Sequence, residues 1–250
     1  MKMMNLVFSP TGGTAKVAEI VAGKFGCTEK IDLAAPDFCA EDVKIDCDAC
    51  VIAVPVIGGR VASAAAERIA ALKGNGAKAI LIAVYGNREF EDALVELQDT
   101  AVAAGFEPVA GIAALAEHSI LRKFAANRPD AEDKAQLEGF AEEIKSVICG
   151  RQEALQLPGN RPYKEFKGSA AKPVVNEKCG QCGLCAANCP VGAIDPAKLS
   201  ETDYGKCFSC MRCIWICPKG GRTCADNVLA NIDAFLTQVA SERKENKLFI

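Results

Sequence analysis

Two cysteine runs of identical spacing constrain this chain most strongly. The first run consists of Cys179, Cys182, Cys185 and Cys189, followed by Pro190. The second consists of Cys207, Cys210, Cys213 and Cys217, followed by Pro218. Three closely spaced thiolates can surround three corners of a cubic iron–sulfur cluster, and the fourth ligand then comes from elsewhere. Structural zinc usually takes two separate Cys-x-x-Cys pairs, so the duplicated run favours iron–sulfur clusters over zinc.

The rest of the chain gives no sign of secretion. Residues 1–8 lead directly into an apolar stretch of strand length, without the separate apolar region and small-residue cleavage site of a signal peptide. There is also no run of about 18 apolar residues that could span a membrane. We therefore expect a cytoplasmic protein whose clustered cysteines are metal ligands or redox groups. The 14 cysteines further suggest an anaerobic host, because clusters and exposed thiols suffer oxidation.

Charge is divided unevenly along the chain. Residues 151–250 hold 14 Lys and Arg against 10 Asp and Glu, whereas residues 1–150 hold 15 against 22. A basic C-terminal part can indicate nucleic-acid binding. Its positive charges are scattered, with no dense run or stripe, so we expect them to balance bound anionic clusters and predict no nucleic-acid partner.

The first 150 residues alternate apolar strands with amphipathic helices. Strands are predicted over residues 3–8, 29–33, 49–56, 79–85 and 108–115, and helices over 14–25, 60–72, 89–104 and 130–149. This alternation predicts an α/β fold in which a doubly wound, five-stranded parallel sheet carries helices on both faces. A ligand is then expected at the carboxyl ends of the strands.

The pattern changes near residue 155. We predict a first domain over residues 1–155 and a linker over 156–175, which is rich in proline and glycine and has no periodicity. A small α+β domain over 176–250 follows, with the cysteine runs and a C-terminal helix over 226–241.

The loop after the first strand has the composition of an anion site. Ser9, Thr11, Gly12, Gly13 and Thr14 join that strand to the first helix. Hydroxyl groups and free backbone N–H groups at a helix N-terminus can bind a phosphate without any lysine. The Gly-Lys-Ser/Thr of a P-loop and the glycine fingerprint of dinucleotide-binding folds are both absent. A serine- and threonine-rich helix cap remains the alternative.

Residues 174–220 resemble a bacterial-type ferredoxin with two 4Fe–4S clusters. In such ferredoxins the fourth cysteine of each run binds the other cluster. The resemblance therefore assigns Cys179, Cys182, Cys185 and Cys217 to one cluster, and Cys207, Cys210, Cys213 and Cys189 to the second. Tyr204, Phe208 and Trp215 lie beside these cysteines and are interpreted as shielding the clusters from water rather than carrying electrons.

The N-terminal half resembles flavodoxins, which bind FMN. Its Ser/Thr-rich loop is similar to their phosphate loop, and the resemblance places the flavin ring between two further loops. These contain Pro55, Val56, Ile57, Gly58 and Gly59, and Tyr85, Gly86 and Asn87. The resemblance makes Gly58 or Gly59 the peptide facing the ring, and Tyr85 the candidate stacking residue. The whole chain resembles a family of anaerobe proteins that fuse a flavodoxin-like domain to a two-cluster ferredoxin.

These features predict electron transfer between iron–sulfur carriers and FMN, with ferredoxin-like proteins as partners. One alternative is a terminal reductase that passes electrons to a small organic acceptor such as a quinone. Another is a sensor or assembly scaffold without flavin. Whether the chain is an enzyme stays open.

Several other residues have a plainer interpretation beside a functional one. His118, the only histidine, lies on the flavin edge and could transfer a proton, but a loop hydrogen-bonding role is more typical. Arg60 and Arg88 could contact flavin or pair with acids. Cys47 and Cys50 have Cys-x-x-Cys spacing, yet Cys50 begins an apolar strand, which favours core thiols.

Overall fold

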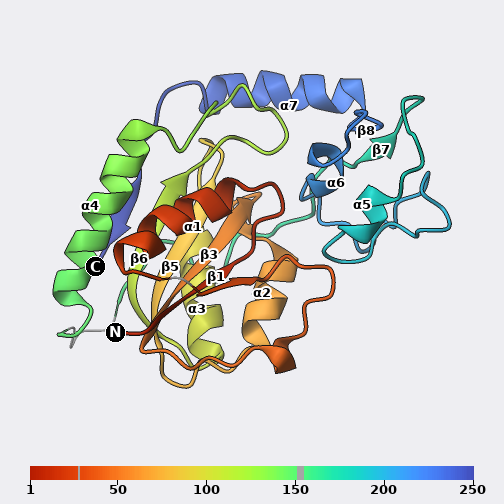
Figure 1. Ribbon diagram of the computed structural model, residues 1–250. Helices are drawn as coiled ribbons and strands as arrows, with labels where there is room; N and C mark the ends of the chain where they lie inside the picture. Colours follow the sequence, from red (N-terminus) through yellow and green to blue (C-terminus); the bar gives the residue numbers. More distant parts are fainter. Residues whose placement is uncertain (28, 151–154) are drawn as a thin grey trace.

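The computed structural model describes residues 1–27, 29–150 and 155–250. Its main sheet contains all five predicted parallel strands, in the spatial order β2-β1-β3-β5-β6 (Figure 1). Their bounds are β1 (Met3–Val7), β2 (Glu29–Asp32), β3 (Ala49–Ile57), β5 (Lys78–Tyr85) and β6 (Glu107–Leu115). Among the parallel strands this is the order 2-1-3-4-5 of flavodoxin-like doubly wound folds. The predicted fold class is confirmed.

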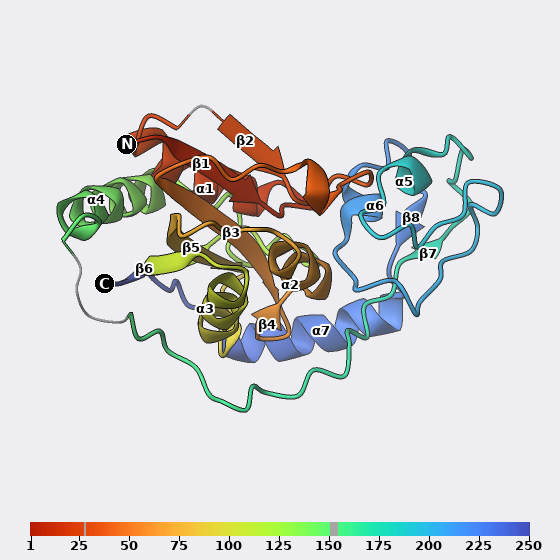
Figure 2. The ribbon, with the colours of Figure 1, turned by 90° about the horizontal axis from the view of Figure 1, so that it is seen from below.

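Helices cover both faces of this sheet (Figure 2). Side chains of α1 (Gly13–Lys24) and α4 (Ala131–Val147) form one core with one sheet face, and side chains of α2 (Ser63–Ala70) and α3 (Ala93–Ala103) form a second core with the opposite face. Successive residues of β5 alternate between the two cores, with Leu81 in one and Ile82 in the other. Both are fully buried, as expected for the central strands of a covered parallel sheet. A single 3-10 turn, η1 (Ala40–Asp42), lies between β2 and β3.

Two short strands that were not predicted extend the sheet. β4 (Arg60–Val61) turns back on the end of β3 as an antiparallel hairpin, so α2 begins at Ser63 and not at residue 60. β9 (Lys247–Phe249) pairs antiparallel with β6, where Leu248 lies opposite Ile112. The C-terminus of the chain therefore ends in the sheet of the N-terminal half.

Residues 155–168, which we call the strap, lie against the sheet domain along α3 (Figure 2). Leu155 and Leu157 at its start are buried in the core beside α2 and α3. Farther along, the carboxylate of Asp92 accepts backbone N–H groups of Asn160 at 2.8 Å and Lys164 at 2.6 Å. Residues 156–173 of the predicted linker contain no helix or strand, β7 (Val174–Val175) lies at its end, and its first half is bound to the surface of the sheet domain.

The cysteine-rich part is small and built from short elements. It contains α5 (Leu184–Ala187), α6 (Arg212–Trp215) and the antiparallel pair β7 (Val174–Val175) and β8 (Arg222–Thr223). Helix α7 (Asp226–Val239) then leads back across the molecule toward β9 (Figure 1). In the described part of the chain, no helix is both long and apolar enough to cross a membrane.

Candidate functional site

The eight cysteines of the two runs line two separate cavities. We call the first the outer site and the second the inner site. The outer site, a cavity of about 140 Å³, is lined by Cys179, Cys182, Cys185 and Cys217. The inner site, a narrower cavity of about 20 Å³, is lined by Cys189, Cys207, Cys210 and Cys213. The structure thus brings together the two sets that the ferredoxin resemblance assigned, with the fourth cysteine of each run on the other site.

The two sites share one backbone geometry. Gln181 and Ser209, which are equivalent in the two runs, both have positive φ, as do the equivalent residues Gly183 and Met211. This left-handed conformation turns the chain around each cavity, and it is rare for residues other than glycine. The exchanged cysteines are equivalent too: the Sγ of Cys189 accepts the Ala193 N–H at 3.2 Å, and the Sγ of Cys217 accepts the Gly221 N–H at 3.1 Å.

Burial and backbone N–H groups act in opposite directions on the pKa values of these thiols. Burial raises the pKa of Cys210 and of Cys213 to about 12. Burial also opposes ionisation of Cys217, but backbone N–H groups of residues 219–222 outweigh it and hold that pKa below its usual value. Among the described residues, no three His, Cys, Asp or Glu side chains converge closely enough to hold a single metal ion. The cysteines surround cavities instead, and four thiolates around a cavity are the donor set of an iron–sulfur cluster.

The inner site packs directly against the sheet domain. Phe208, which lines it, lies 5.9 Å from the ring of Phe8 at the end of β1. The guanidinium of Arg212 donates to the backbone oxygen of Ala34 at 2.6 Å, and Arg68 of α2 donates to the backbone oxygen of Pro190. The outer site has an exposed rim, where Cys182 is exposed and Leu184 is 44% exposed.

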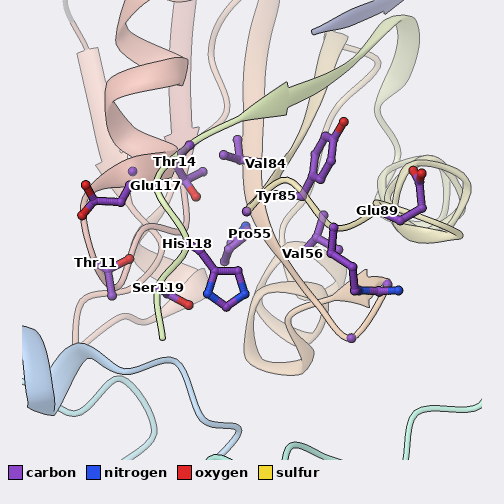
Figure 3. A pocket seen from close by; sticks show the side chains of 16 residues that line it. Thr11, Thr14, Pro55, Val56, Val84, Tyr85, Glu89, Glu117, His118 and Ser119 are labelled. Carbon is purple, nitrogen blue, oxygen red and sulfur yellow. The ribbon is translucent and has the colours of Figure 1, made fainter. Parts of the chain in front are cut away.

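A third cavity, of about 110 Å³, lies where the parallel strands end (Figure 3). Nine of the predicted flavin-site residues line it: Thr11, Gly13, Thr14, Pro55, Val56, Gly58, Gly59, Tyr85 and Gly86. Seven further residues complete the lining: Val84, Arg88, Glu89, Ala116, Glu117, His118 and Ser119. Segments from four strand ends therefore meet at one place, as the doubly wound topology requires.

The loop after β1 has the geometry of an anion site. Ser9 does not line the cavity, because its hydroxyl accepts the Ala15 N–H at 2.9 Å and holds the loop against α1. Gly12, also outside the lining, precedes α1 with φ +89°, a conformation that favours glycine. Gly13 allows close packing, since an added Cβ would lie 3.0 Å from the Cβ of Ala116. The first backbone N–H groups of a helix lack intrahelical partners, so Gly13 and Thr14 suit a phosphate.

Two other predicted residues are not part of the cavity. The side chain of Asn87 is buried and donates at 2.7 Å to the backbone oxygens of Ala240 and Glu242, so it holds the end of α7. Ile57 packs against the core beside α2 and α3. Both residues lie in the predicted loops, but their side chains make structural contacts and do not line the cavity.

Tyr85 lines the cavity but has no free ring face for stacking on a ligand. It is 4% exposed and meets Phe90 edge-on, with 5.6 Å between ring centroids. Figure 3 shows its side chain directed away from His118 and Ser119. Burial raises its pKa to about 12, so the hydroxyl stays protonated. The structure therefore places Tyr85 in the core, contrary to the stacking role expected for it.

His118 is a neutral side chain at the cavity. Its Nδ1 accepts the N–H groups of Ile120 at 3.3 Å and Leu121 at 3.1 Å, which leaves the proton on Nε2. Burial, together with the charge of Arg88, lowers its pKa to about 4. The ring lies so close to Gly86 that an added Cβ there would be 2.5 Å from His118 Cδ2. The sequence singles out His118 as a candidate, whereas Glu89, Glu117 and Ser119 are lining residues that it did not single out as site residues.

The remaining candidates have mainly structural contacts. Arg60 forms two hydrogen bonds of 2.7 Å to Glu96, and Arg88 pairs with Glu91 at 3.0 Å, although Arg88 also lines the cavity. Cys50 is buried in the core, and both the hydrogen bond to Cys47 and burial raise its pKa well above the usual value.

One bond joins the cavity to the inner cysteine site. The indole Nε1–H of Trp215 donates to the backbone oxygen of Ser119 at 2.8 Å. Trp215 belongs to α6, the helix that also carries Cys213. The guanidinium of Arg122 lies 4.5 Å from the centre of the Trp215 ring and covers it.

Comparisons with known proteins identify the cysteine-rich part. Residues 172–195 match the family model described as a 4Fe-4S binding domain. A protein of the ion-translocating oxidoreductase complex of Methanosarcina acetivorans is 41% identical over 54 residues, which cover 21% of this chain and 20% of that protein. An uncharacterized protein of Methanothermobacter thermautotrophicus is 30% identical over 81 residues, or 31% of this chain and 18% of that protein. The chain thus matches only about a fifth of the length of these curated relatives.

Solved flavodoxins resemble the N-terminal half. Flavodoxin 2 from Bacillus cereus has 16% identity and a TM-score of 0.45, and covers 58% of this chain and 99% of its own. The Fusobacterium nucleatum flavodoxin bound to flavin mononucleotide has 16% identity and a TM-score of 0.41, covering 58% and 98%. The fold itself is defined by the strand order described above. The chain joins a domain with the flavodoxin-like strand order to a C-terminal part that contains a match to a 4Fe-4S binding domain.

Proposed function

We propose that this protein transfers electrons between low-potential iron–sulfur carriers and an FMN site, coupling one-electron to two-electron steps. When bound, the clusters supply one-electron chemistry and FMN supplies two-electron chemistry, while the protein supplies binding, spacing and potential. The observation that carries this proposal is the hydrogen bond from Trp215 to Ser119, because it joins the inner cysteine site to the wall of the flavin cavity.

The cysteine sets are the proposed ligands of two 4Fe–4S clusters. Cys179, Cys182, Cys185 and Cys217 would hold one at the outer site, and Cys189, Cys207, Cys210 and Cys213 would hold one at the inner site. The lining of the two cavities supports this division. The Sγ of Cys189 and the Sγ of Cys217 each accept a backbone N–H group, and hydrogen bonds of this kind orient and tune the sulfur ligands of a cluster.

The positions of the two sites favour different tasks. The inner site is enclosed by contacts with the sheet domain, including those of Phe208 and Arg212, so it suits exchange within the chain. The outer site has an exposed rim around Cys182 and Leu184, so it suits exchange with a separate redox protein. The relative from an ion-translocating oxidoreductase complex supports such protein partners.

The third cavity is the proposed FMN site. The hydroxyls and N–H groups of Thr11, Gly13 and Thr14 would bind the phosphate, and the peptides at Gly58 and Gly59 would face the ring. Gly58 and Gly59 both have positive φ, so the hairpin tip presents backbone rather than side chains to the cavity. His118 can donate a hydrogen bond from Nε2 into the site.

His118 gives no support to the terminal-reductase alternative. A reductase of a small organic acceptor needs a proton source, and His118 is the only histidine beside the site. Because its pKa is about 4, it is neutral above about pH 5 and has no imidazolium proton to deliver.

Anaerobic reconstitution tests the proposal directly. After incubation with iron, sulfide and FMN and removal of the excess, we expect about eight iron atoms and one FMN per chain. Full iron content with no retained flavin would favour the scaffold alternative. Turnover of a quinone by the reconstituted protein without any partner would favour the terminal reductase.

A further inference from the structure

The ring of Phe166 packs against Gly58, a residue that lines the proposed flavin cavity. This strap residue lies against Gly58, where an added Cβ would meet Phe166 Cε2 at 2.3 Å and Cδ2 at 2.5 Å. Gly58 lines the cavity at the tip of the hairpin formed by β3 and β4. Only a residue without a side chain lets the aromatic ring approach this tip so closely.

The strap is held in place by several bonds in the residues just before this contact. Asp92 accepts three hydrogen bonds, from the backbone N–H of Asn160, its side-chain amide and the backbone N–H of Lys164. Arg60, the first residue of β4, donates to the backbone oxygen of Lys164 at 2.7 Å. The ammonium of Lys164 pairs with Glu91 at 2.8 Å. Phe166 therefore follows a fixed point of the chain, only two residues away.

Phe166 is nevertheless 38% exposed, although it is a large apolar side chain in contact with its own domain. Exposed apolar surface beside a cavity is covered when a flat apolar ligand binds there. Among the described lining residues, Tyr85 is the only Phe, Tyr or Trp. Its ring is in edge-on contact with the ring of Phe90. The described lining of the cavity therefore offers no free aromatic face to an isoalloxazine ring, whereas Phe166 is a partly exposed aromatic residue in contact with Gly58 of that lining.

We propose that the strap completes the flavin site and that Phe166 is a further FMN-binding residue, which contacts the isoalloxazine ring beside Gly58. This inference rests on the FMN site proposed above. It gives residues 155–168 a task beyond joining two domains, because the bonds to Asp92 and Arg60 bring an aromatic side chain to the hairpin that faces the ring. Contact between aromatic rings adds binding free energy beyond the free energy expected from the apolar area that the rings bury.

Equilibrium dialysis of FMN against the full chain, with its clusters in place, tests this proposal. Phe166→Ala should raise the FMN dissociation constant by about 10-fold, within the range of one aromatic contact. Phe166→Leu should weaken binding as well, because it keeps an apolar group without the ring, whereas Phe166→Trp should bind at least as tightly as the parent. Phe235→Ala removes another exposed phenylalanine, on α7, and should change nothing.

The outcomes separate this inference from the proposed function. Equal FMN affinity of the parent and Phe166→Ala would overturn the role of Phe166 and leave the FMN site standing. Full affinity in Phe166→Leu would show that apolar packing suffices and would overturn the aromatic contact. A parent protein that binds no FMN would overturn the proposed function and this inference with it. The iron content and urea midpoint of each variant should equal those of the parent, because Phe166 is not part of a core.

Discussion

Trp215 donates its indole N–H to the backbone oxygen of Ser119 at 2.8 Å, and this bond joins two parts of the molecule that differ in fold and in expected cofactor. Ser119 lines the cavity at the strand ends. Trp215 lies two residues after Cys213, which lines the inner cysteine site. The sequence suggested that this tryptophan shields a cluster, and the structure adds a direct bond to the flavin-site loop.

Replacing Trp215 with phenylalanine should slow electron exchange between the two halves without removing either cofactor. The variant loses one hydrogen bond, worth about 1 kcal/mol of folding free energy. With it goes the direct contact between α6 and the loop that contains Ser119. Rapid mixing with a low-potential reductant should show cluster reduction at the parent rate and flavin reduction slowed. Tyr204→Phe is a matched control. It also removes a hydrogen bond from an aromatic side chain, to the backbone oxygen of Pro173, but this bond lies outside the cavity at the strand ends. Equal rates in parent and Trp215→Phe would exclude this path.

The exchange of the fourth cysteines can be tested by iron content. A chain in which Cys207, Cys210 and Cys213 are all serine should keep the outer cluster alone, with about four iron atoms. Adding Cys217→Ser to that chain should destroy the remaining 4Fe–4S signal in electron paramagnetic resonance. Adding Cys189→Ser instead should leave it intact. The reverse pattern would mean that each run supplies all four ligands of its own cluster.

His118 should make the folding stability depend on pH between about 4 and 6.5. Its pKa is about 4 in the folded protein against 6.5 when unperturbed, so the unfolded state binds more protons in this range. Stability should therefore fall as pH is lowered, by about 2 kcal/mol between pH 7.5 and pH 5.

The matched variant for this effect is His118→Asn. Its side-chain oxygen can still accept the N–H groups of Ile120 and Leu121, but it does not titrate. Urea unfolding at several pH values should show that this variant lacks the slope of the parent between pH 5 and pH 7. Parallel curves for both proteins would contradict the neutral, buried state of His118.

Replacing Asp92 with alanine should release the strap. Asp92 is 2% exposed, and its loss leaves the N–H groups of Asn160 and Lys164 without their acceptor. Because hydrogen bonds to a charged group are strong, we expect the substitution to lower the free energy of unfolding by about 2 kcal/mol. Limited proteolysis should then cut within residues 155–168 faster than in the parent. Asp37→Ala, at an exposed loop position, is the control, and strap cleavage at the same rate in both variants would argue against the anchor.

The sequence predicted the main sheet well because its strands are continuous apolar runs, which a covered parallel sheet requires. It did not predict β9, whose three residues carry no periodicity. That strand depends on Asn246, which accepts the Leu115 N–H at 2.9 Å and donates to Asp133 at 2.8 Å. Such contacts join residues more than a hundred positions apart, and no local pattern reveals them.

The ferredoxin resemblance divided the eight cysteines into two sets, and the two cysteine cavities are lined by these same sets. For the proposed flavin cavity, the sequence predicted the location but not the direction of the side chains around it. Loop position identified Gly58 and Gly86 correctly as lining residues, but the direction of each side chain depends on tertiary packing. Asn87 thus faces the end of α7, and Tyr85 packs against Phe90. Phe166, which is proposed to contact the flavin ring, comes from a segment that the sequence predicted as a plain linker.

Stepwise anaerobic reduction of the protein reconstituted with iron, sulfide and FMN tests the central claim most directly. Visible spectra recorded at each addition of a low-potential donor separate the bands of the clusters from those of the flavin. We predict that both are reduced, and that electrons added through the clusters appear at FMN without any added mediator. Clusters that become reduced while the bound flavin stays oxidised would contradict electron transfer between the two halves.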